Sequence, residues 1–393
     1  MNPQDFHYGG VGARAPRRRT RLWTVVAAVG AAALALIVGI AVIVVSGSPK
    51  ASTDALRPGP SDAPSGSPSN GGATAGASGK TTRKCTVSAK LVPSCGVWWG
   101  VTPGAFTTTP PRQALSTFER RTGRTVDVFH YFHRGKQIFP TPTEIAIARQ
   151  PGKNRRLLLN WKPDDGESFA KVAAGSMDAH IDRLSGHIKQ NFPERFWLVI
   201  HHEPEEEINL KAGSGHTPTD YSRMFRRVVK RFRANGVKNI LFTVAYRGYS
   251  NWYTKPWFMQ TYPGNDVVDW VALDPYVKEA AKTPDFASLI DKAGPLEHDQ
   301  GHPGFYTWSQ SHMPGKPLMI AEWGILYDKT TAAERVAFFR SVATQIKNFP
   351  RIKALVYFEA PHGGLGDSQI HTDPATLRAY RELGRRPEFN PSP

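Results

Sequence analysis

Eight short apolar runs are spaced along the chain after residue 85, and most of them are separated by stretches of helical period. The runs are CGVWWGV (95–101), VDVFHYF (126–132), RLLLNW (156–161), FWLVIHHE (196–203), NILFTVAY (239–246), VVDWVALDPY (267–276), KPLMIAEWG (316–324) and IKALVYFEA (352–360). They are rich in branched and aromatic residues without polar alternation, which is typical of strands buried on both faces. The pattern therefore predicts parallel strands inside a covered sheet.

Helical patterns alternate with these runs. They lie at 112–121, 143–150, 168–189, 221–236, 330–347 and 376–384. The helix at 143–150 is short, and the one after the fifth run is barely visible. Strand and helix alternating over about 300 residues predict a (β/α)8 barrel, that is, an α/β fold of the TIM-barrel type. An open doubly wound sheet is the alternative, although no glycine-rich phosphate loop follows the first run.

The N-terminal part of the chain has a different composition. Residues 1–21 are polar and end in a basic cluster, and residues 22–45 contain no charge. At about 1.5 Å per residue such a run can cross a hydrocarbon layer about 30 Å thick. It is longer than the apolar core of a cleaved signal peptide, so we expect an uncleaved anchor with a cytoplasmic N-terminus. A twin-arginine export signal at Arg18 and Arg19 is the alternative.

A linker and a folded domain follow the anchor. Residues 46–84 are almost entirely Ser, Gly, Ala, Pro and Thr, which predicts a flexible tether with a reach of roughly 35 Å. Residues 85–393 are expected to form one extracellular domain of a single-pass protein of the cell membrane. Cys85 and Cys95, the only cysteines, predict a disulfide at the start of this domain. Two unpaired thiols remain the alternative.

The net charge of +17 is unevenly distributed. Residues 1–84 hold 10 Lys/Arg and 3 Asp/Glu, which leaves +10 for the following 309 residues. The densest cluster lies on a helical pattern and comprises Arg223, Arg226, Arg227, Lys230, Arg231 and Arg233. We interpret it as a solvated helix face and expect no nucleic-acid partner. An outward-facing protein of this charge meets anionic cell-surface polymers more often than DNA.

Polar residues collect at the C-terminal ends of the predicted strands, where barrels of this type carry their chemistry. They are His130, His133, Asn160, Lys162, His201, His202, Glu203, Glu205, Asp274, Tyr276, Glu322, Glu359 and His362. Glu203 and Glu322 stand out because each ends an apolar run. Two carboxylates delivered by separate strands are what retaining cleavage of a glycosidic bond requires.

At these positions the chain resembles glycoside hydrolase family 26, whose best-known members are β-mannanases. The resemblance rests on His-Glu at 202–203, Glu-Trp-Gly at 322–324 and Asp-Pro-Tyr at 274–276, and it extends over nearly all of 95–386. It implies that Glu203 is the general acid/base and Glu322 the nucleophile. It also implies that His202 orients the acid or touches the sugar, and that Tyr276 donates a hydrogen bond to the nucleophile.

Aromatic residues near the same strand ends could stack on sugar rings. The candidates are Trp99, Tyr131, Trp161, Trp252, Trp323 and Tyr357. Core packing is the alternative for each of them, and it is the interpretation we favour for Trp197 and Trp270. Glu359 is a rival nucleophile, but a buried structural role suits it better.

The resemblance leaves the substrate open. Many mannanases carry an arginine before the His-Glu pair and Met-Asn-Gly after it, whereas here Leu198 to Ile200 precede it and Pro204 to Glu207 follow it. We expect a monomeric endo-β-glycanase that acts on β-1,4-mannan, with mixed-linkage β-1,3-1,4-glucan or β-1,3-xylan as alternatives. A non-catalytic carbohydrate-binding barrel is a further alternative. No cofactor or metal is expected, because no HExxH spacing occurs and adjacent strand residues such as His201 and His202 point in opposite directions.

Overall fold

The computed structural model describes residues 85–291 and 302–391, apart from residue 360 and residues 363–365. The predicted cytoplasmic segment, membrane anchor and linker, which together run from residue 1 to 84, lie outside the described residues. Within the part that the structure describes, no helix is both long enough and apolar enough to cross a membrane.

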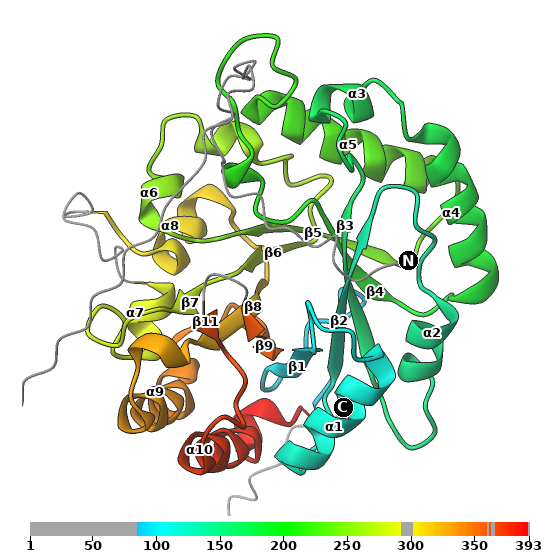
Figure 1. The fold of residues 1–393 in the computed structure, drawn as a ribbon. Helices are drawn as coiled ribbons and strands as arrows, with labels where there is room; N and C mark the ends of the chain where they lie inside the picture. The colour runs from blue at the N-terminus through cyan, green and yellow to red at the C-terminus, as the bar shows by residue number, and fades with distance from the viewer. Residues whose placement is uncertain (1–84, 292–301, 360, 363–365, 392–393) are drawn as a thin grey trace, which may run out of the picture. The chain divides into compact units, whose positions relative to one another are not determined.

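Eight parallel strands close into a barrel (Figure 1). They are β1 (Trp98–Pro103), β2 (Val128–Arg134), β3 (Arg156–Lys162), β4 (Phe196–Ile200), β5 (Ile240–Tyr246), β6 (Trp270–Leu273), β8 (Leu318–Ile325) and β9 (Ile352–Glu359). Pairing of β1 with β9 closes the ring, and β6 pairs with β8. The two-residue strand β7 (Tyr276–Val277) follows β6 and also pairs with β8. A small antiparallel pair, β10 (Pro361–His362) and β11 (Gly366–Asp367), follows β9. The predicted barrel and its eight strands are confirmed.

Helices surround the barrel (Figure 1). They are α1 (Pro111–Thr122), α2 (Pro142–Ala148), α3 (Phe169–Ala173), α4 (Asp178–Asn191), α5 (Pro218–Ala234), α6 (Ser250–Tyr253), α7 (Phe286–Ile290), α8 (Phe305–His312), α9 (Ala332–Gln345) and α10 (Pro374–Gly384). The single helix predicted over 168–189 is wrong, because the chain breaks into α3 and α4 at Gly175. The φ of this residue is +106°, which favours glycine. No helix was predicted where α7 and α8 lie.

The barrel has an inner and an outer apolar core, because side chains alternate between the two faces of each strand. The inner core includes Trp98, Trp197 and Trp270, and the outer core packs the strands against the helices. The segment 85–95 covers the N-terminal end of the barrel. There the Trp98 indole donates to the Leu91 carbonyl at 2.7 Å, and the Trp270 indole donates to the Lys90 carbonyl at 2.7 Å.

The predicted disulfide is confirmed. Cys85 and Cys95 are bonded to each other, with their Cα atoms 5.5 Å apart. The bridge closes the same segment whose carbonyl groups accept the two indole hydrogen bonds. It therefore constrains the covering of the barrel's N-terminal end rather than its mouth.

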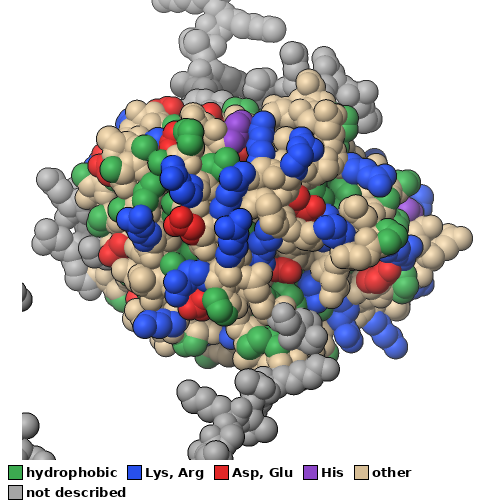
Figure 2. Space-filling view, turned by 90° about the horizontal axis from the view of Figure 1, so that it is seen from below, with side chains coloured by type: hydrophobic (Ala, Val, Ile, Leu, Met, Phe, Trp, Pro, Cys, Tyr) green, Lys and Arg blue, Asp and Glu red, His purple; other side chains and the backbone are tan. Residues whose placement is uncertain are grey.

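The positive charge is dispersed over the described surface. Figure 2 shows one face of the molecule, on which Lys and Arg side chains are interspersed with acidic and apolar ones. On α5, Arg226 pairs with Asp266 at 2.7 Å and Arg231 pairs with Asp182 at 2.5 Å. Some arginines of the predicted solvated helix face therefore form ion pairs with acids of neighbouring elements. These ion pairs account for the basic cluster without a nucleic-acid ligand.

We expect Trp270→Phe to lower the free energy of unfolding by about 1–3 kcal/mol more than Trp197→Phe does, measured by denaturant titration. Both substitutions shrink a buried indole to a phenyl ring. Only the first also removes a hydrogen bond, the one from the indole to the partly buried carbonyl of Lys90, and the loss of such a bond costs about that much. The Trp197 indole nitrogen has no partner among the described residues. Equal losses in the two variants would contradict this account of the covering segment.

Candidate functional site

Glu203 and Glu322, the two glutamates singled out from the sequence, are both buried at the mouth of the barrel. Glu322 lies on β8, and Glu203 lies three residues beyond the end of β4. His201 and Glu203 have φ angles of +50° and +53°, which is left-handed backbone that side chains with a Cβ rarely adopt. The N–H of His201 donates to the Trp161 carbonyl at 2.8 Å, and the N–H of Glu203 donates to the Ala245 carbonyl at 2.9 Å. Neighbouring strands thus hold this strained segment in place.

Tyr276 connects the two sides of the site. Its hydroxyl donates a hydrogen bond to Oε2 of Glu322 at 2.7 Å, the contact that the family resemblance implied. Its backbone N–H donates to the hydroxyl of Tyr249 at 3.1 Å. The position of the phenol is therefore fixed by β7 and by the loop after β5, independently of any substrate.

Four acidic side chains form a buried carboxylate cluster, which consists of Glu203, Glu205, Asp274 and Glu322. Burial raises the pKa of all four, to about 8 for Glu205 and Glu322. The negative charge of Glu203 raises the pKa of Glu322 further, whereas the hydrogen bond from Tyr276 opposes this rise. Groups coupled in this way titrate as a pair. Ionisation of Glu203 therefore disfavours ionisation of Glu322.

Arg247, which the sequence reasoning missed, is the main cation beside this cluster. It directly follows β5, and its Nη1 lies 4.0 Å from Oε2 of Glu203 and forms an ion pair with Glu206. Its backbone N–H donates to Oε1 of Glu205 at 2.6 Å. The sequence places Arg247 directly after an apolar run, where barrels carry site residues, but a single arginine at such a position matches no motif.

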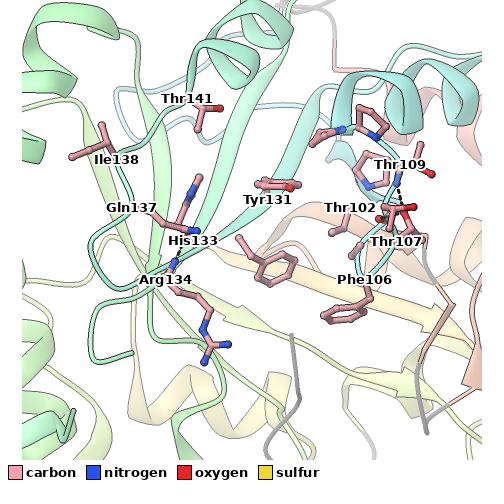
Figure 3. A pocket seen from close by; sticks show the side chains of 17 residues that line it. Thr102, Phe106, Thr107, Thr109, Tyr131, His133, Arg134, Gln137, Ile138 and Thr141 are labelled. Carbon is pink, nitrogen blue, oxygen red and sulfur yellow. Dashed lines mark hydrogen bonds between the residues drawn. The ribbon is translucent and has the colours of Figure 1, made fainter. Parts of the chain in front are cut away.

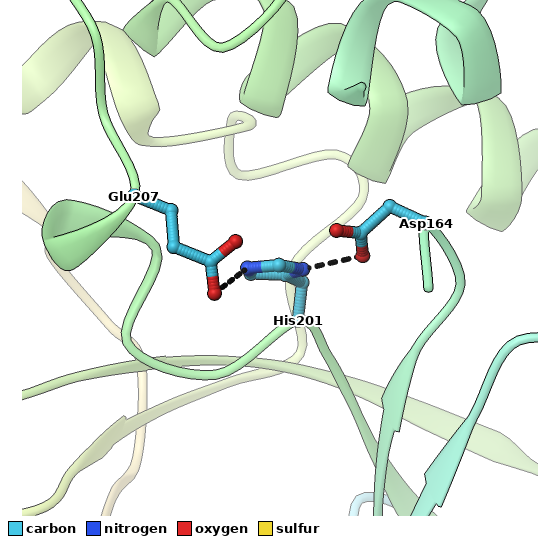
Figure 4. A group of neighbouring side chains, drawn as sticks. All are labelled: Asp164, His201 and Glu207. Atoms are coloured by element: carbon cyan, nitrogen blue, oxygen red, sulfur yellow. Dashed lines mark hydrogen bonds and ion pairs between the residues drawn. The ribbon is translucent and has the colours of Figure 1, made fainter. Parts of the chain in front are cut away.

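His201 is clamped between two carboxylates (Figure 4). Its Nδ1 lies 2.7 Å from Oδ1 of Asp164, and its Nε2 lies 3.3 Å from Oε1 of Glu207. Burial favours the neutral ring, but the charge of Asp164 and the hydrogen bonds to both acids outweigh it, so the pKa of His201 is raised. Lys162 contacts Glu207 at 2.6 Å and completes the chain of alternating charges.

The same three residues, Asp164, His201 and Glu207, could each offer one ligand atom to a metal ion. Their arrangement fits a protonated imidazole better, because the two carboxylates contact opposite ring nitrogens. The ammonium of Lys162 already lies against Glu207, where a metal ion would have to bind. We therefore interpret the cluster as a structural clamp beneath the left-handed segment.

His202 and His130 are held neutral near the mouth. Burial lowers the pKa of His130 to about 3, and the hydroxyl of Thr102 lies 2.7 Å from its Nδ1. Burial also lowers the pKa of His202, and the charge of Lys162 acts in the same direction. The ring of His202 packs edge-on against Phe132, with centroids 5.5 Å apart. A neutral imidazole beside Glu203 can donate or accept a hydrogen bond without competing for the charge of the glutamate.

Four of the predicted sugar-stacking aromatics are placed elsewhere. Trp99, Trp161, Trp323 and Tyr357 are fully buried in the outer core, between the barrel and its helices. Trp161 contacts Phe232 of α5, and Tyr357 contacts Tyr380 of α10. The prediction that these four line the site is wrong. Each is an immediate neighbour in sequence of an inward-facing position, and alternation along the strand turns it to the opposite face.

The other two predicted aromatics are only partly buried. Trp252 lies on α6 and packs edge-on against Trp257, with ring centroids 6.2 Å apart. Tyr131 lines a pocket of about 520 Å³ between the loops that follow β1 and β2 (Figure 3). Phe106 and Phe132 line the same pocket together with the polar side chains of Arg134 and Gln137. Phe132 also contacts His202, the residue that precedes Glu203.

Glu359, the rival nucleophile, has a structural role. One of its oxygens accepts a hydrogen bond from the backbone N–H of Ile370 at 2.9 Å, and the other lies 3.1 Å from Nδ1 of His371. The side chain therefore fastens the loop after β9 to the barrel. The side chain of His362, which the sequence also singled out, lies outside the described residues.

Comparison with known proteins agrees with the family resemblance. The model of glycosyl hydrolase family 26 matches residues 172–298, a segment that includes Glu203 and Tyr276 but not Glu322. Endoglucanase H of Acetivibrio thermocellus is 26% identical over 304 residues, which cover 76% of this chain and 31% of that protein. The chain thus spans about a third of the length of this relative. The predicted resemblance and the predicted class, glycoside hydrolases, are confirmed by these matches.

Solved structures of similar fold include family 26 enzymes. The family 26 domain of an endo-β-mannanase/endo-β-glucanase from Prevotella bryantii is 13% identical, with a TM-score of 0.49, and the match covers 76% of this chain and 92% of that one. A Cellulomonas fimi endo-β-1,4-mannanase is 15% identical, with a TM-score of 0.47 and coverage of 75% and 71%.

We expect His201→Gln to lower the free energy of unfolding by about 2–4 kcal/mol at pH 6, because it removes the charge that pairs with the buried acid Asp164. The pKa of His201 is raised above its unfolded value of about 6.5. Its stabilising contribution is therefore complete below pH 6.5 and is lost as the pH rises through the folded-state pKa. The difference between variant and wild type should shrink towards pH 9 in thermal melts.

His216→Gln is the matched control, because His216 packs against Phe169 as His201 does but makes no ion pair among the described residues. We expect it to cost less stability at pH 6 than His201→Gln does, because it removes ring packing without removing an ion pair. A pH-independent loss in His201→Gln would show that the imidazole is not a charged clamp.

Proposed function

We propose that this chain, a relative of the family 26 glycoside hydrolases, is a retaining endo-β-glycanase in which Glu203 is the acid/base and Glu322 the nucleophile. The observation that carries the proposal is the buried glutamate pair with Tyr276 hydrogen-bonded to one member. A hydrogen bond to a carboxylate favours its charged form. On this basis we assign the ionised form to Glu322 and the proton to Glu203.

The chemistry then follows in two steps. Glu322 attacks the anomeric carbon while Glu203 protonates the oxygen of the departing sugar, so that a covalent glycosyl–enzyme forms. Glu203, now a carboxylate, takes a proton from water, which attacks the anomeric carbon and releases Glu322. Two inversions retain the configuration. Arg247, 4.0 Å from Glu203, stabilises the carboxylate form that exists between the steps.

For the substrate, we propose a β-1,4-linked backbone, with β-mannan as the first candidate and β-glucan as the second. The resemblance to β-mannanases supports mannan. The curated relative that matches most of this chain is named an endoglucanase, which supports glucan. The pocket beside His202, lined by Tyr131, Phe106 and Phe132, offers apolar ring faces to sugar units next to the cleaved bond.

We also propose that the domain acts outside the cell, held at the membrane by residues 22–45 and tethered by residues 46–84. The disulfide between Cys85 and Cys95 supports this location, because such bonds persist in oxidising compartments. The uncharged run of 24 residues and the arginines before it support the anchor and its orientation.

We expect Glu203→Gln and Glu322→Gln each to lower kcat at least about a thousandfold, since each removes a group that takes part in bond making or breaking. Reducing ends released from β-mannan, glucomannan, mixed-linkage glucan and β-1,3-xylan measure the activity, and NMR of the first product tests for the β-anomer. Glu359→Gln is the control and should remain active, since a glutamine can still accept the hydrogen bond from Ile370. Sugar binding without turnover on every polymer would favour a non-catalytic barrel instead.

We expect Tyr276→Phe to lower kcat/KM about tenfold to a hundredfold, because a hydrogen bond to a charged group is worth about 1.5–3 kcal/mol. It should also move the acidic limb of the pH–activity profile to higher pH. Without the hydroxyl the pKa of Glu322 rises, so the nucleophile stays protonated up to a higher pH. If the pH–activity profile loses height but its acidic limb does not move, Tyr276 acts on the substrate rather than on Glu322.

A further inference from the structure

We propose that the side of the mouth formed by the ends of β5 and β7 binds a negatively charged group of the glycan, through Lys278 and Arg247. The substrate would then be an acidic β-glycan that carries carboxylates, either in the sugar ring as a uronate or on a substituent. The inference rests on the proposed glycanase function and specifies its substrate class.

Lys278 is the observation from which the proposal starts. It directly follows β7, is only partly exposed, and has no carboxylate within 4.0 Å among the described residues. The neighbouring acid, Glu279, contacts Lys282 at 3.0 Å and Lys329 at 3.7 Å instead. A half-buried ammonium loses hydration, and the charge of Glu203, which lies beyond contact distance, offsets this loss only in part. A ligand anion in contact with the ammonium would add to that compensation.

A second cation lies beside it. The Nζ of Lys278 and the guanidinium carbon of Arg247 lie 5.6 Å and 5.5 Å from the centre of the Tyr249 ring. Burial and the charge of Arg247 lower the pKa of Lys278, whereas the charge of Glu203 raises it. An arrangement that holds two like charges together is relieved when an anion binds to both.

The position of the pair relates it to the cleaved bond. Arg247 contacts the acid side through Glu203, and the hydroxyl of Tyr249 accepts a hydrogen bond from the N–H of Tyr276, the residue that holds Glu322. An anion bound by Lys278 and Arg247 would therefore belong to a sugar unit at or next to the reacting one. Lys162 also lies near the mouth and contacts Glu207 at 2.6 Å, and Arg247 is likewise paired with Glu206. Of the three cations, Lys278 is therefore the one without a carboxylate in contact among the described residues.

The proposed ligand chemistry differs from that of the pocket beside Tyr131. That pocket combines aromatic rings with threonine and glutamine side chains, and its one arginine, Arg134, pairs with Asp165 at 3.5 Å. Such a lining suits uncharged sugar faces. On the other side of the mouth, Lys278 and Arg247 lie against the ring of Tyr249. A polymer with alternating neutral and acidic units, or with acidic branches, could use both sides of the mouth.

The test compares matched polymers on the purified full-length protein. Mixed-linkage glucan and glucomannan are each assayed as the neutral polymer, as the polymer with part of its C6 hydroxyls oxidised to carboxylates, and as the carboxymethylated polymer. We expect about tenfold higher kcat/KM on a carboxylated form at low salt, the size of one charge-assisted hydrogen bond. The advantage should shrink in 0.5 M NaCl, which screens charges. Preference for the oxidised form indicates a uronate, and preference for the carboxymethyl form indicates a substituent.

Lys278→Gln should reduce the ratio of activity on charged and neutral polymer about tenfold, with an unchanged melting temperature. Lys230→Gln, which removes an exposed lysine from α5, is the matched control and should keep the ratio. Equal or better cleavage of the neutral polymer by the wild type would overturn the proposal, as would an unchanged ratio in Lys278→Gln.

Binding separates this inference from the proposed reaction. Calorimetry on the Glu203→Gln protein compares its affinity for oxidised oligosaccharides with its affinity for neutral ones, and it needs no turnover. A preference for the oxidised ligand that depends on Lys278 supports the anion site even if no polymer is cleaved, in which case only the proposed reaction fails. No preference in binding overturns the anion site, whatever the activity.

Discussion

Closure of the barrel by β1 and β9 is the constraint on which the site depends. Six residue pairs, from Trp98 opposite Ala354 to Pro103 opposite Glu359, complete the ring of parallel strands. Closure brings the ends of β4 and β8, which are separated by more than a hundred residues in the sequence, to one mouth. It also removes water from the interior, so that carboxyl groups delivered there have raised pKa values. The same step therefore creates both the proximity and the electrostatics of the glutamate pair.

Features that depend on local pattern could be predicted from the sequence. Features that depend on which face of a strand a side chain occupies could not. The eight strands follow from apolar runs, and the glutamates follow from their positions at the ends of those runs. Trp161 and Asn160 are adjacent on β3, yet one lies in the outer core and the other faces the interior. Without the register, alternation predicts that one of them faces inward but not which one. The four misplaced aromatics all have this cause.

The helices α7 and α8 were missed for a different reason. Both are short, and much of their stability comes from tertiary contacts rather than from a repeated apolar stripe. Phe305 packs against Tyr246 and Tyr253, and Phe286 packs against Phe349. Such contacts join segments far apart in sequence. Arg247 and Lys278 could not be recognised from the sequence for a similar reason, because what relates them is that both lie against the ring of Tyr249.

The run of three glutamates after the His-Glu pair first suggested that this chain differs from mannanases in its contacts with the sugar. The structure gives each of these glutamates an internal partner: Glu205 accepts the N–H of Arg247, Glu206 pairs with its guanidinium, and Glu207 contacts His201 and Lys162. These acids hold a left-handed segment that carries Glu203. The charges of Glu206 and Glu207 are paired with cations in doing so. Differences in specificity must then arise from groups at the mouth that have no such partner, and among the described cations beside Glu203, Lys278 is the one without a carboxylate in contact.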